Sequence, residues 1–262
     1  IEILTCNSNK SKYFNKKIKF IGPKSLFWQN KPRPIKYLVC IFFLFINLLK
    51  KRSNKLIFAF QANIYAIIIA KILCSKIIVR ANSAPSGWSQ NIIKKKLYSI
   101  IINLADDAMV NSNDFRREFN KNFKIKSKCI YNPFYNSKLN LNSEKKLFQK
   151  KSLKILSIGR LTKQKDHMTL LKAAKLINPI NKPEFVIIGK GDQYINLKNF
   201  IDLNHLHNKV KLVGYKPNAY NYIKKCDIFI LTSKYEGLPN VLLEAQFFKK
   251  YIISSNCPTG PK

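Results

Sequence analysis

The stretch LKILSIGRLTKQKDHMTLLKAAKLI, residues 153–177, decides the fold class, because it holds a strand, a loop and a helix in succession. Residues 153–158 form a short, mostly apolar run, which predicts a buried strand. Apolar residues recur with a helical period over 167–177. Gly159 permits a tight exit from the strand. A strand that leads directly into a helix is half of a βαβ unit, which predicts a parallel sheet.

The same alternation continues to residue 255 and is present, less regularly, in the first half. Further strands are expected at 184–189, 210–214, 227–233 and 251–255, and helices at 194–206, 219–225 and 239–248. Earlier strands are expected within 1–6, 56–61, 76–81, 107–112 and 128–134, and helices within 35–49, 63–73, 90–104 and 113–121. The polar segment 135–152 is typical of an interdomain linker. The sequence predicts an α/β chain with two Rossmann-like domains, residues 1–150 and 151–262.

The chain is strongly basic, with 48 Lys and Arg against 13 Asp and Glu and a net charge of +35. A basic field attracts polyanions, so a nucleic-acid-binding protein is one alternative. Only 6 of the 48 bases are Arg, however, and Arg is favoured for bidentate recognition of phosphates and bases. The high Lys content is also what an AT-rich coding sequence produces. We therefore expect no nucleic-acid partner.

Cysteine usage indicates neither a metal centre nor a disulfide framework. The six cysteines are widely scattered and form no Cys-x-x-Cys pair: Cys6, Cys40, Cys74, Cys129, Cys226 and Cys257. Reduced thiols of this kind are typical of a cytoplasmic protein.

The segment IKYLVCIFFLFINLL, residues 35–49, is the most membrane-like part of the chain. Its fifteen residues are too few to span a bilayer comfortably. Two interpretations stay open: a buried helix that covers a sheet, and a helix that lies on a membrane surface with its flanking lysines in the headgroups.

Two loops after predicted strands contain residues suited to a phosphorylated ligand, since ligands of open parallel sheets bind beyond the carboxyl ends of the strands. In GRLTKQKDH, Arg160 and Lys165 can converge on one anion, although a solvated loop would contain the same residue types. In IGKGDQ, Gly189 and Gly191 allow close approach of the backbone to a ligand, or serve only to reverse the chain. The third glycine of the dinucleotide fingerprint is absent from this loop, so it gives no support for pyridine-nucleotide binding.

The segment KYEGLPNVLLEA, residues 234–245, places two carboxylates around an expected helix start. Gly237 can turn the chain, and Pro239 suits the first helical turn. The backbone N–H groups from Leu238 through Asn240 to Val241 and the helix dipole suit a phosphate. Glu236 and Glu244 would then flank that phosphate and bind hydroxyl groups of polyols. The alternative is a first-turn acid at Glu236 and a surface residue at Glu244.

Together, GRLTKQKDH, IIGKGDQ, LVGYKPN and SKYEGLPNVLLEA resemble family 4 glycosyltransferases. The spacing of Glu236 and Glu244 matches that family's Glu, seven residues, Glu motif. VRANSAPSGW, ADDAMVNSNDFRREF and CIYNPF resemble the family's acceptor-side domain more loosely. The resemblance implies a GT-B fold, in which two Rossmann-like domains face a cleft, and a retaining transfer from a nucleoside-diphosphate sugar to a glycan or lipid-linked acceptor.

By this resemblance, Arg160 and Lys165 hold the diphosphate, Glu236 contacts sugar hydroxyls and Glu244 the ribose. Gly159, Gly189, Gly191 and residues 237–241 complete the donor site, no cofactor or metal is needed, and neither Glu is a nucleophile. Arg80, Asn82 and Ser83 are the acceptor-side candidates. The expected location is the cytoplasm, with contact at the inner face of the membrane. The family pattern also leads us to expect both domains to be truncated and this piece alone to be inactive or nearly so. A catalytically degenerate, membrane-associated relative is a further alternative.

Overall fold

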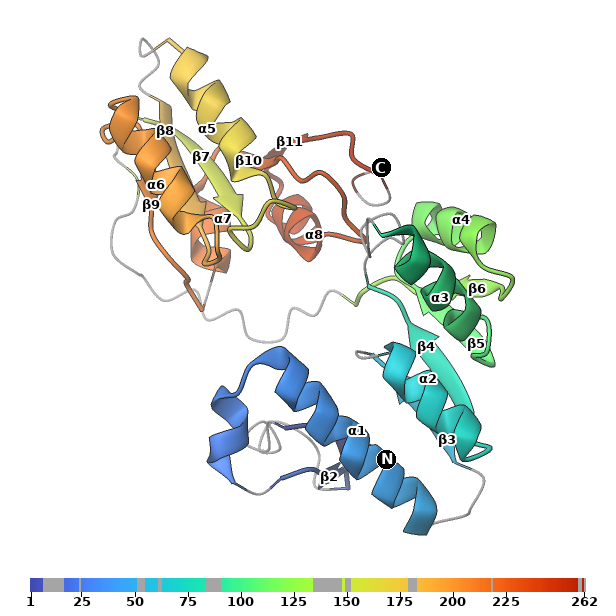
Figure 1. The fold of residues 1–262 in the computed structure, drawn as a ribbon. Coiled ribbons are helices and arrows are strands. Elements are labelled where there is room, and N and C mark those ends of the chain that lie inside the picture. The colour runs from blue at the N-terminus through green and yellow to red at the C-terminus, as the bar shows by residue number, and fades with distance from the viewer. Residues whose placement is uncertain are drawn as a thin grey trace. The chain divides into compact units, whose positions relative to one another are not determined.

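The computed structural model describes residues 1–6, 17–23, 25–50, 55–60, 63–82, 91–133, 148, 152–178, 183–217, 219–258 and 261. They form two compact units (Figure 1). The first unit comprises Ile1–Val110 with Phe119–Lys128, and the second comprises Asn111–Glu118 with Cys129–Lys262. Most of the expected linker 135–152 lies outside the described residues, so the domain boundary near residue 150 stays a prediction.

The second unit contains a five-stranded sheet in which every neighbouring pair of strands is parallel. Its strands are β7 (Leu153–Ile158), β8 (Pro183–Ile188), β9 (Val210–Leu212), β10 (Ile228–Leu231) and β11 (Tyr251–Ser254). Their order across the sheet is β11-β10-β7-β8-β9. Successive strands extend the sheet from β7 towards β9 and then resume at β10 on the other side of β7. This reversal is the topological switch point of a Rossmann-like sheet.

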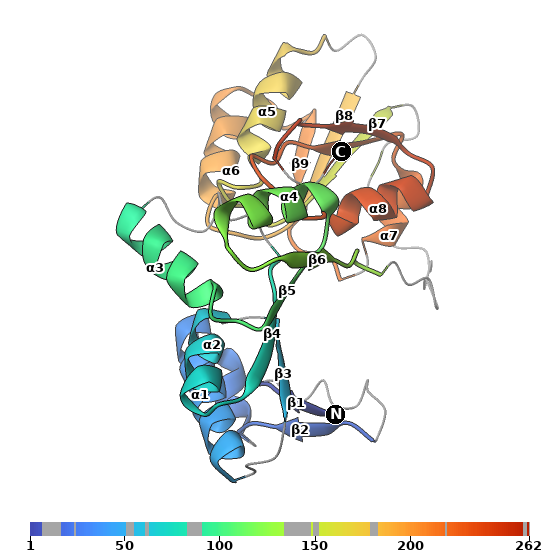
Figure 2. The ribbon, with the colours of Figure 1, turned by 90° about the vertical axis from the view of Figure 1, so that its right-hand side faces the viewer.

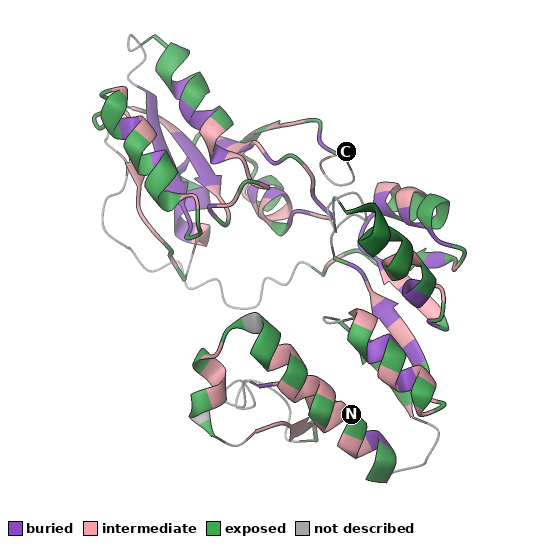
Figure 3. Cartoon of the chain, in the orientation of Figure 1, coloured by how far each residue is buried: buried purple, intermediate pink, exposed green. Residues whose placement is uncertain are grey.

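Helices cover both faces of this sheet, since its strands are apolar on both sides. The helices are α5 (His167–Leu176), α6 (Tyr194–Leu203), α7 (Tyr220–Lys225) and α8 (Asn240–Phe247). Ile155 packs with residues of α5 and α6 on one face. Its neighbour Leu156 packs with residues of α7 and α8 on the other. Figure 3 shows the buried residues concentrated in the central strands and on the inward sides of these helices. The predicted α/β architecture with a parallel sheet is confirmed for this unit.

A second parallel sheet, assembled in simple chain order, forms the centre of the first unit. Its strands are β3 (Leu56–Ala59), β4 (Lys76–Arg80), β5 (Asp107–Val110) and β6 (Ser127–Cys129). β1 (Glu2–Leu4) and β2 (Lys19–Ile21) form a separate parallel pair, and β2 was not expected from the sequence. The helices are η2, a 3-10 helix (Leu26–Asn30), α1 (Arg33–Lys50), α2 (Asn63–Ile72) and α3 (Ile92–Ile102), while α4 (Asn113–Asn122) is divided between the two units. Figure 2 shows α1, α2 and α3 on the same side of β3 and β4.

The helix expected over residues 35–49 is longer than predicted, and it is only partly buried. α1 packs against β1 and α2, and Leu48 on its inward side is buried. Its outward residues Leu38 and Phe42 are exposed. The interpretation as a buried covering helix therefore holds for the inward side of α1 and is wrong for its outward face. Among the described residues, no helix is long and apolar enough to cross a membrane.

Candidate active site

The candidate site lies where the loops after β7 and β10 leave the switch point of the second unit. Gly159 to Asp166 follow β7, and Thr232 to Pro239 follow β10. The two loops are joined: the Lys234 amide donates to the Gln164 carbonyl at 2.8 Å, and the Thr232 hydroxyl donates to the Lys165 carbonyl at 3.1 Å. Ligands of such sheets bind beyond the carboxyl ends of the strands at this point.

Lys165 and Glu236, which are 71 residues apart, form a buried ion pair across these loops. Lys165 Nζ lies 2.5 Å from Glu236 Oε1. The two side chains are only 13% and 8% exposed. Burial of both charges is tolerated because each has the other as a partner. The structure thus brings together Lys165, which was predicted to bind the diphosphate, and Glu236, which was predicted to bind the sugar.

Gln164, which the sequence analysis did not single out, fastens this arrangement. Its side-chain amide Nε2 donates to the Tyr235 carbonyl at 2.9 Å, next to Glu236. Its Oε1 accepts a hydrogen bond from Arg160 at 3.3 Å. Gln164 therefore orients Arg160 and the residue before Glu236 at the same time. Its place in the expected anion-binding loop was a signal, but its partner at Tyr235 could not be read from the sequence.

Gly189 and Gly191 are required by close packing of the loops after β7 and β8. A Cβ atom on Gly189 would lie 1.8 Å from the Gly159 carbonyl oxygen, and one on Gly191 would lie 2.2 Å from the Leu161 carbonyl oxygen. The Gly159 amide donates to the Ile188 carbonyl at 3.0 Å, which holds the two loops together. These contacts explain both glycines as supports of the Arg160 loop. Their direct binding of a donor stays a prediction.

α8 begins next to the ion pair, one residue later than expected. Pro239 is the N-cap, with an extended backbone and no side-chain cap hydrogen bond, and Asn240 is the first helical residue. Gly237 and Pro239 are buried, Leu238 and Val241 are half-buried, and Asn240 is exposed. The helix dipole adds partial positive charge at this helix start, four residues after Glu236. An anion at this helix start would meet donors from the backbone as well as a cation.

Glu244 lies in the second turn of α8 and is largely removed from solvent. Burial raises the pKa of its carboxyl group from 4.5 to about 7. Tyr220 is close by, since burial and the Glu244 charge together raise the pKa of its hydroxyl group. A surface role for Glu244 does not explain this environment. A partly buried carboxyl group is suited to accept hydrogen bonds from ligand hydroxyls.

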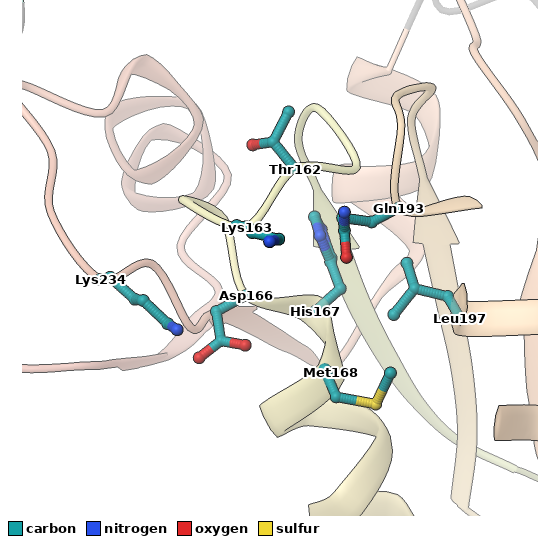
Figure 4. A pocket seen from close by; sticks show the side chains of 8 residues that line it. All are labelled: Thr162, Lys163, Asp166, His167, Met168, Gln193, Leu197 and Lys234. Atoms are coloured by element: carbon teal, nitrogen blue, oxygen red, sulfur yellow. The ribbon is translucent and has the colours of Figure 1, made fainter. Parts of the chain in front are cut away.

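A cavity of about 240 Å³ lies beside the loop after β7 (Figure 4). Its lining residues are Thr162, Lys163, Asp166, His167, Met168, Gln193, Leu197 and Lys234. Burial, with the nearby Lys165 charge, lowers the pKa of His167 to about 4, so this imidazole is neutral at physiological pH. His167 Nδ1 and the Thr162 hydroxyl find no hydrogen-bond partner within the described part of the chain.

The acceptor-side candidates occupy the end of β4 in the first unit. Arg80 Nε donates to Asn82 Oδ1 at 3.3 Å, and the Arg80 guanidinium lies over the Phe60 ring at 5.8 Å. Asn82 also donates to the Phe60 carbonyl at 3.4 Å. Ser83 lies outside the described residues. Arg80 and Asn82 do lie together, and their contact with an acceptor stays a prediction.

Two expectations concern metals and cysteines. Within the described ranges, no group of three or more His, Cys, Asp or Glu side chains could hold a metal ion. All six cysteines are free thiols.

Sequence comparison connects the chain with glycosyltransferases. The family described as Glycosyl transferases group 1 matches residues 140–262. An uncharacterized glycosyltransferase of Methanocaldococcus jannaschii is 30% identical over an alignment of 218 residues, which covers 74% of this chain and 54% of that protein. The N-acetylgalactosamine-N,N'-diacetylbacillosaminyl-diphospho-undecaprenol 4-alpha-N-acetylgalactosaminyltransferase of Campylobacter jejuni is 34% identical over 66% of this chain and 47% of its own length. The chain spans about half the length of these relatives.

Solved structures of other proteins share the fold of this chain. Anabaena Alr3699/HepE in complex with UDP-glucose superposes with a TM-score of 0.70 and 21% identity, over 87% of this chain and 66% of that one. A glycosyltransferase from Rickettsia africae superposes with a TM-score of 0.67 and 18% identity, over 98% and 71%. The family match over residues 140–262 includes Arg160, Lys165, Glu236 and Glu244. Residues 140–262 of the chain thus belong to the family described as Glycosyl transferases group 1.

Proposed function

We propose that this protein is a retaining glycosyltransferase that moves a sugar from a nucleoside-diphosphate sugar to a glycan or lipid-linked acceptor in the synthesis of cell-surface polysaccharides or glycoconjugates. The observation that carries the proposal is the buried Lys165–Glu236 pair at the switch point, 2.5 Å apart and next to the start of α8. A cation, a helix N-terminus and a hydroxyl-binding carboxylate meet there. A nucleotide sugar has a diphosphate, which suits the cation and the helix start, and a sugar and a ribose on either side of it, whose hydroxyl groups suit the carboxylates.

Arg160 and Lys165 are assigned to the diphosphate, Glu236 to the sugar hydroxyls and Glu244 to the ribose. Lys165 pairs directly with Glu236, and this ion pair keeps both side chains in place until the donor binds. A bound diphosphate would accept hydrogen bonds from Lys165 and from the first amides of α8. Glu236 would then be free to accept from the sugar.

The transfer step depends on the negative charge that grows on the departing nucleoside diphosphate. Arg160, Lys165 and the positive end of α8 are fixed before the reaction and stabilise that charge without reorganising. This set of cations supports a mechanism without a metal. Glu236, paired with Lys165, is a binding group in this scheme and not a nucleophile.

We propose a uridine-diphosphate sugar as donor and a diphospho-undecaprenol-linked glycan as acceptor class. Anabaena Alr3699/HepE was solved with UDP-glucose. A matched Escherichia coli protein is a UDP-Gal:alpha-D-GlcNAc-diphosphoundecaprenol alpha-1,3-galactosyltransferase. Arg80, Asn82 and Ser83 are assigned to the acceptor side, and the cytoplasm, with contact at the inner face of the membrane, to the location. The GT-B cleft between the domains belongs to the same proposal.

Calorimetric titration with UDP and with uridine tests the proposal. We expect Arg160→Ala and Lys165→Ala to weaken binding of UDP by at least about tenfold and that of uridine much less, since they remove charge-assisted bonds to phosphate. Lys172→Ala, at an exposed site of α5, is the control and should bind UDP normally. Equal losses for both ligands, or no UDP binding by the unmodified protein, would refute the assignment.

The remaining alternatives are separated by the same variants. A nucleic-acid-binding protein would bind DNA or RNA with a steep salt dependence that survives Glu236→Ala and Glu244→Ala. A catalytically degenerate relative would bind UDP yet release no sugar from any UDP-sugar. Truncation of both domains and inactivity of the 262-residue chain stay predictions, which turnover by this chain and by any longer form would test.

A further inference from the structure

Two cysteines of the first unit lie in contact with each other, although they are 34 residues apart in the chain. Cys6 Sγ lies 3.5 Å from Cys40 Sγ. The Cys6 thiol also donates to the Lys36 carbonyl at 3.4 Å, one helical turn before Cys40. Cys6 is only 6% exposed, and Cys40 is half-buried. The two sulfurs therefore meet between the end of β1 and the inward side of α1.

The neighbouring backbone holds the two cysteines in this position. α1 packs against β1. The Thr5 amide donates to the Ile21 carbonyl at 3.0 Å, which fastens the chain next to Cys6 to β2. Near the other end of β1, the Asn47 side chain of α1 donates to Glu2 at 3.2 Å. The contact between β1 and α1 is thus held by a hydrogen bond at one end and by the two thiols at the other.

The distance between the two sulfurs suits a disulfide bond. The bond length is about 2.05 Å, so the sulfurs have to approach each other by about 1.5 Å. Rotation of two unbranched side chains supplies a movement of this size. Groups that are held in contact react with each other at a high effective concentration. The folded chain therefore favours a bond between Cys6 and Cys40 over bonds to the other cysteines.

Protonation sets the rate at which this pair reacts. Burial, together with the neighbouring Cys6, raises the pKa of the Cys40 thiol from 9.0 to about 12. Cys40 therefore keeps its proton at neutral pH. Because the thiolate and not the thiol attacks a disulfide, we expect oxidation of the pair to take hours and not seconds.

We propose that Cys6 and Cys40 form a reversible disulfide site that is oxidised by low-molecular-weight disulfides such as oxidised glutathione. In the first step, a thiolate of the pair attacks one sulfur of oxidised glutathione, forms a mixed disulfide and releases a glutathione thiolate. In the second step, the other cysteine gives up its proton and attacks the protein sulfur of the mixed disulfide. The second glutathione leaves, so two protein thiols become one disulfide and one glutathione disulfide becomes two thiols.

The bond would fasten β1 to α1 at the carboxyl end of β1. A link between residues 34 positions apart restricts the unfolded chain and so stabilises the folded one. Under reducing conditions the pair stays as thiols, and the bond forms only under oxidising conditions. The inference goes beyond the proposed function and does not depend on it, because Arg160, Lys165, Glu236 and Glu244 belong to the second unit.

Incubation of the 262-residue chain with oxidised glutathione tests the proposal. Peptide mapping without reductant should find a Cys6–Cys40 cross-link, which dithiothreitol should remove. The oxidised chain should have a Tm about 5 °C or more above that of the reduced chain. In urea the same treatment should give mixed pairs among the six cysteines, because the contact between Cys6 and Cys40 is lost.

Cys74→Ala is the matched control, since Cys74 is an exposed thiol of the same unit. This variant should retain the cross-link and the rise in Tm, and Cys40→Ala should lose both. If Cys40→Ala fails to fold by circular dichroism, Cys40→Ser replaces it, and mapping of the unmodified chain needs no variant.

Three results would each overturn the proposal. The first is oxidation of Cys74 without a Cys6–Cys40 cross-link. The second is a cross-link that forms no faster in the folded chain than in urea, since the folded contact would then have no part in it. The third is an oxidised chain whose Tm is equal to or below that of the reduced chain, because the bond would then not fasten β1 to α1.

Discussion

Each unit has an ion pair at the ends of its strands. The pair of the second unit lies at the carboxyl ends and is buried, and that of the first unit lies at an amino end and is more exposed. In the second unit, Lys165 and Glu236 meet beyond the carboxyl ends of β7 and β10, at 13% and 8% exposure. In the first unit, Asp106 precedes β5 and pairs with Lys71 at 2.7 Å, with both side chains about a third exposed. Asp106 also accepts the Ile77 amide at 2.7 Å and so fastens β4 to the start of β5.

The difference in depth separates a binding arrangement from a fastening one. An exposed pair adds little to stability, because water screens its charges. A buried pair costs desolvation that a well-packed apolar pair would avoid. The Lys165–Glu236 pair lies at the edge where ligands of parallel sheets bind, which is also the proposed donor site.

The largest expected effect breaks the buried pair. Lys165→Met leaves the Glu236 carboxylate buried without its cation and should lower the free energy of unfolding by about 3–5 kcal/mol. Lys165→Met/Glu236→Leu should recover most of that loss, since apolar residues replace both charges. Urea unfolding of Lys165→Met, Glu236→Leu and the double variant measures these free energies of unfolding. A double variant as unstable as Lys165→Met would mean that packing, and not the unpaired charge, sets the cost.

The next effect compares the pH dependence of two carboxyl groups. Burial raises the pKa of Glu244 to about 7 from 4.5, so the folded state holds an extra proton between these values. Stability should fall as pH rises from about 4.5 to about 7 and stay level above that. Glu244→Gln should then raise the free energy of unfolding at pH 8 by about 1–2 kcal/mol, allowing for its partial exposure, and change little at pH 4.

Asp106 is the opposite case. Burial opposes ionisation of this carboxyl group, but the hydrogen bonds from Lys71 and from the Ile77 amide outweigh burial, and its pKa is lowered from 3.8. Its contribution to stability is present above pH 3.8 and is lost as pH falls through the lower folded value. Asp106→Asn should therefore destabilise only above that range. Unfolding curves from pH 3 to pH 8 for both variants check the two signs, and parallel profiles would contradict them.

A smaller effect concerns the residue that connects the loops. Gln164→Ala removes the hydrogen bonds to Arg160 and to the Tyr235 carbonyl and should cost about 1 kcal/mol in stability. As a positioning residue, Gln164 should affect UDP binding more than uridine binding, since Arg160 loses its orientation. Asn196→Ala, in an exposed part of α6, is a control. If Gln164→Ala weakened the binding of UDP and of uridine equally, Gln164 would have only a structural role.

The smallest effect is expected at the exposed pair. Lys71→Met should lower the free energy of unfolding by about 0.5 kcal/mol or less, and added salt should reduce the difference further. UDP binding should be unaffected, because Lys71 belongs to the first unit. If Lys71→Met lowered the free energy of unfolding nearly as much as Lys165→Met, the proposed difference between the two ion pairs would be wrong.

Much of the fold could be predicted from local patterns, and the failures have local reasons. The strand at 153–158 and the helices at 167–177 and 113–121 were located to within a few residues, since apolar period and flanking glycine agree there. β2 was missed because its three residues, KFI, are too short to show a period. Residues 35–49 were identified as a helix, but a run that is apolar all round does not tell which side is covered.

The candidate site was predicted as a set of residues and not as an arrangement. Arg160 and Lys165 after one strand, and Glu236 and Glu244 around a helix start, followed from strand order and motif spacing. The direct pairing of Lys165 with Glu236, the bridging by Gln164 and the neutral His167 were not predicted. Each depends on contacts between segments that are far apart in the chain or on depth below the surface.

The sequence by itself determined the α/β class, the parallel strands and the residues that meet at the switch point, because periodicity and turn chemistry act over a few neighbouring residues. The tertiary structure alone decided which of those charges are buried together and which apolar residues of α1 face outward. Burial sets the free energy of a charge or an apolar side chain, and burial is a property of the packed chain.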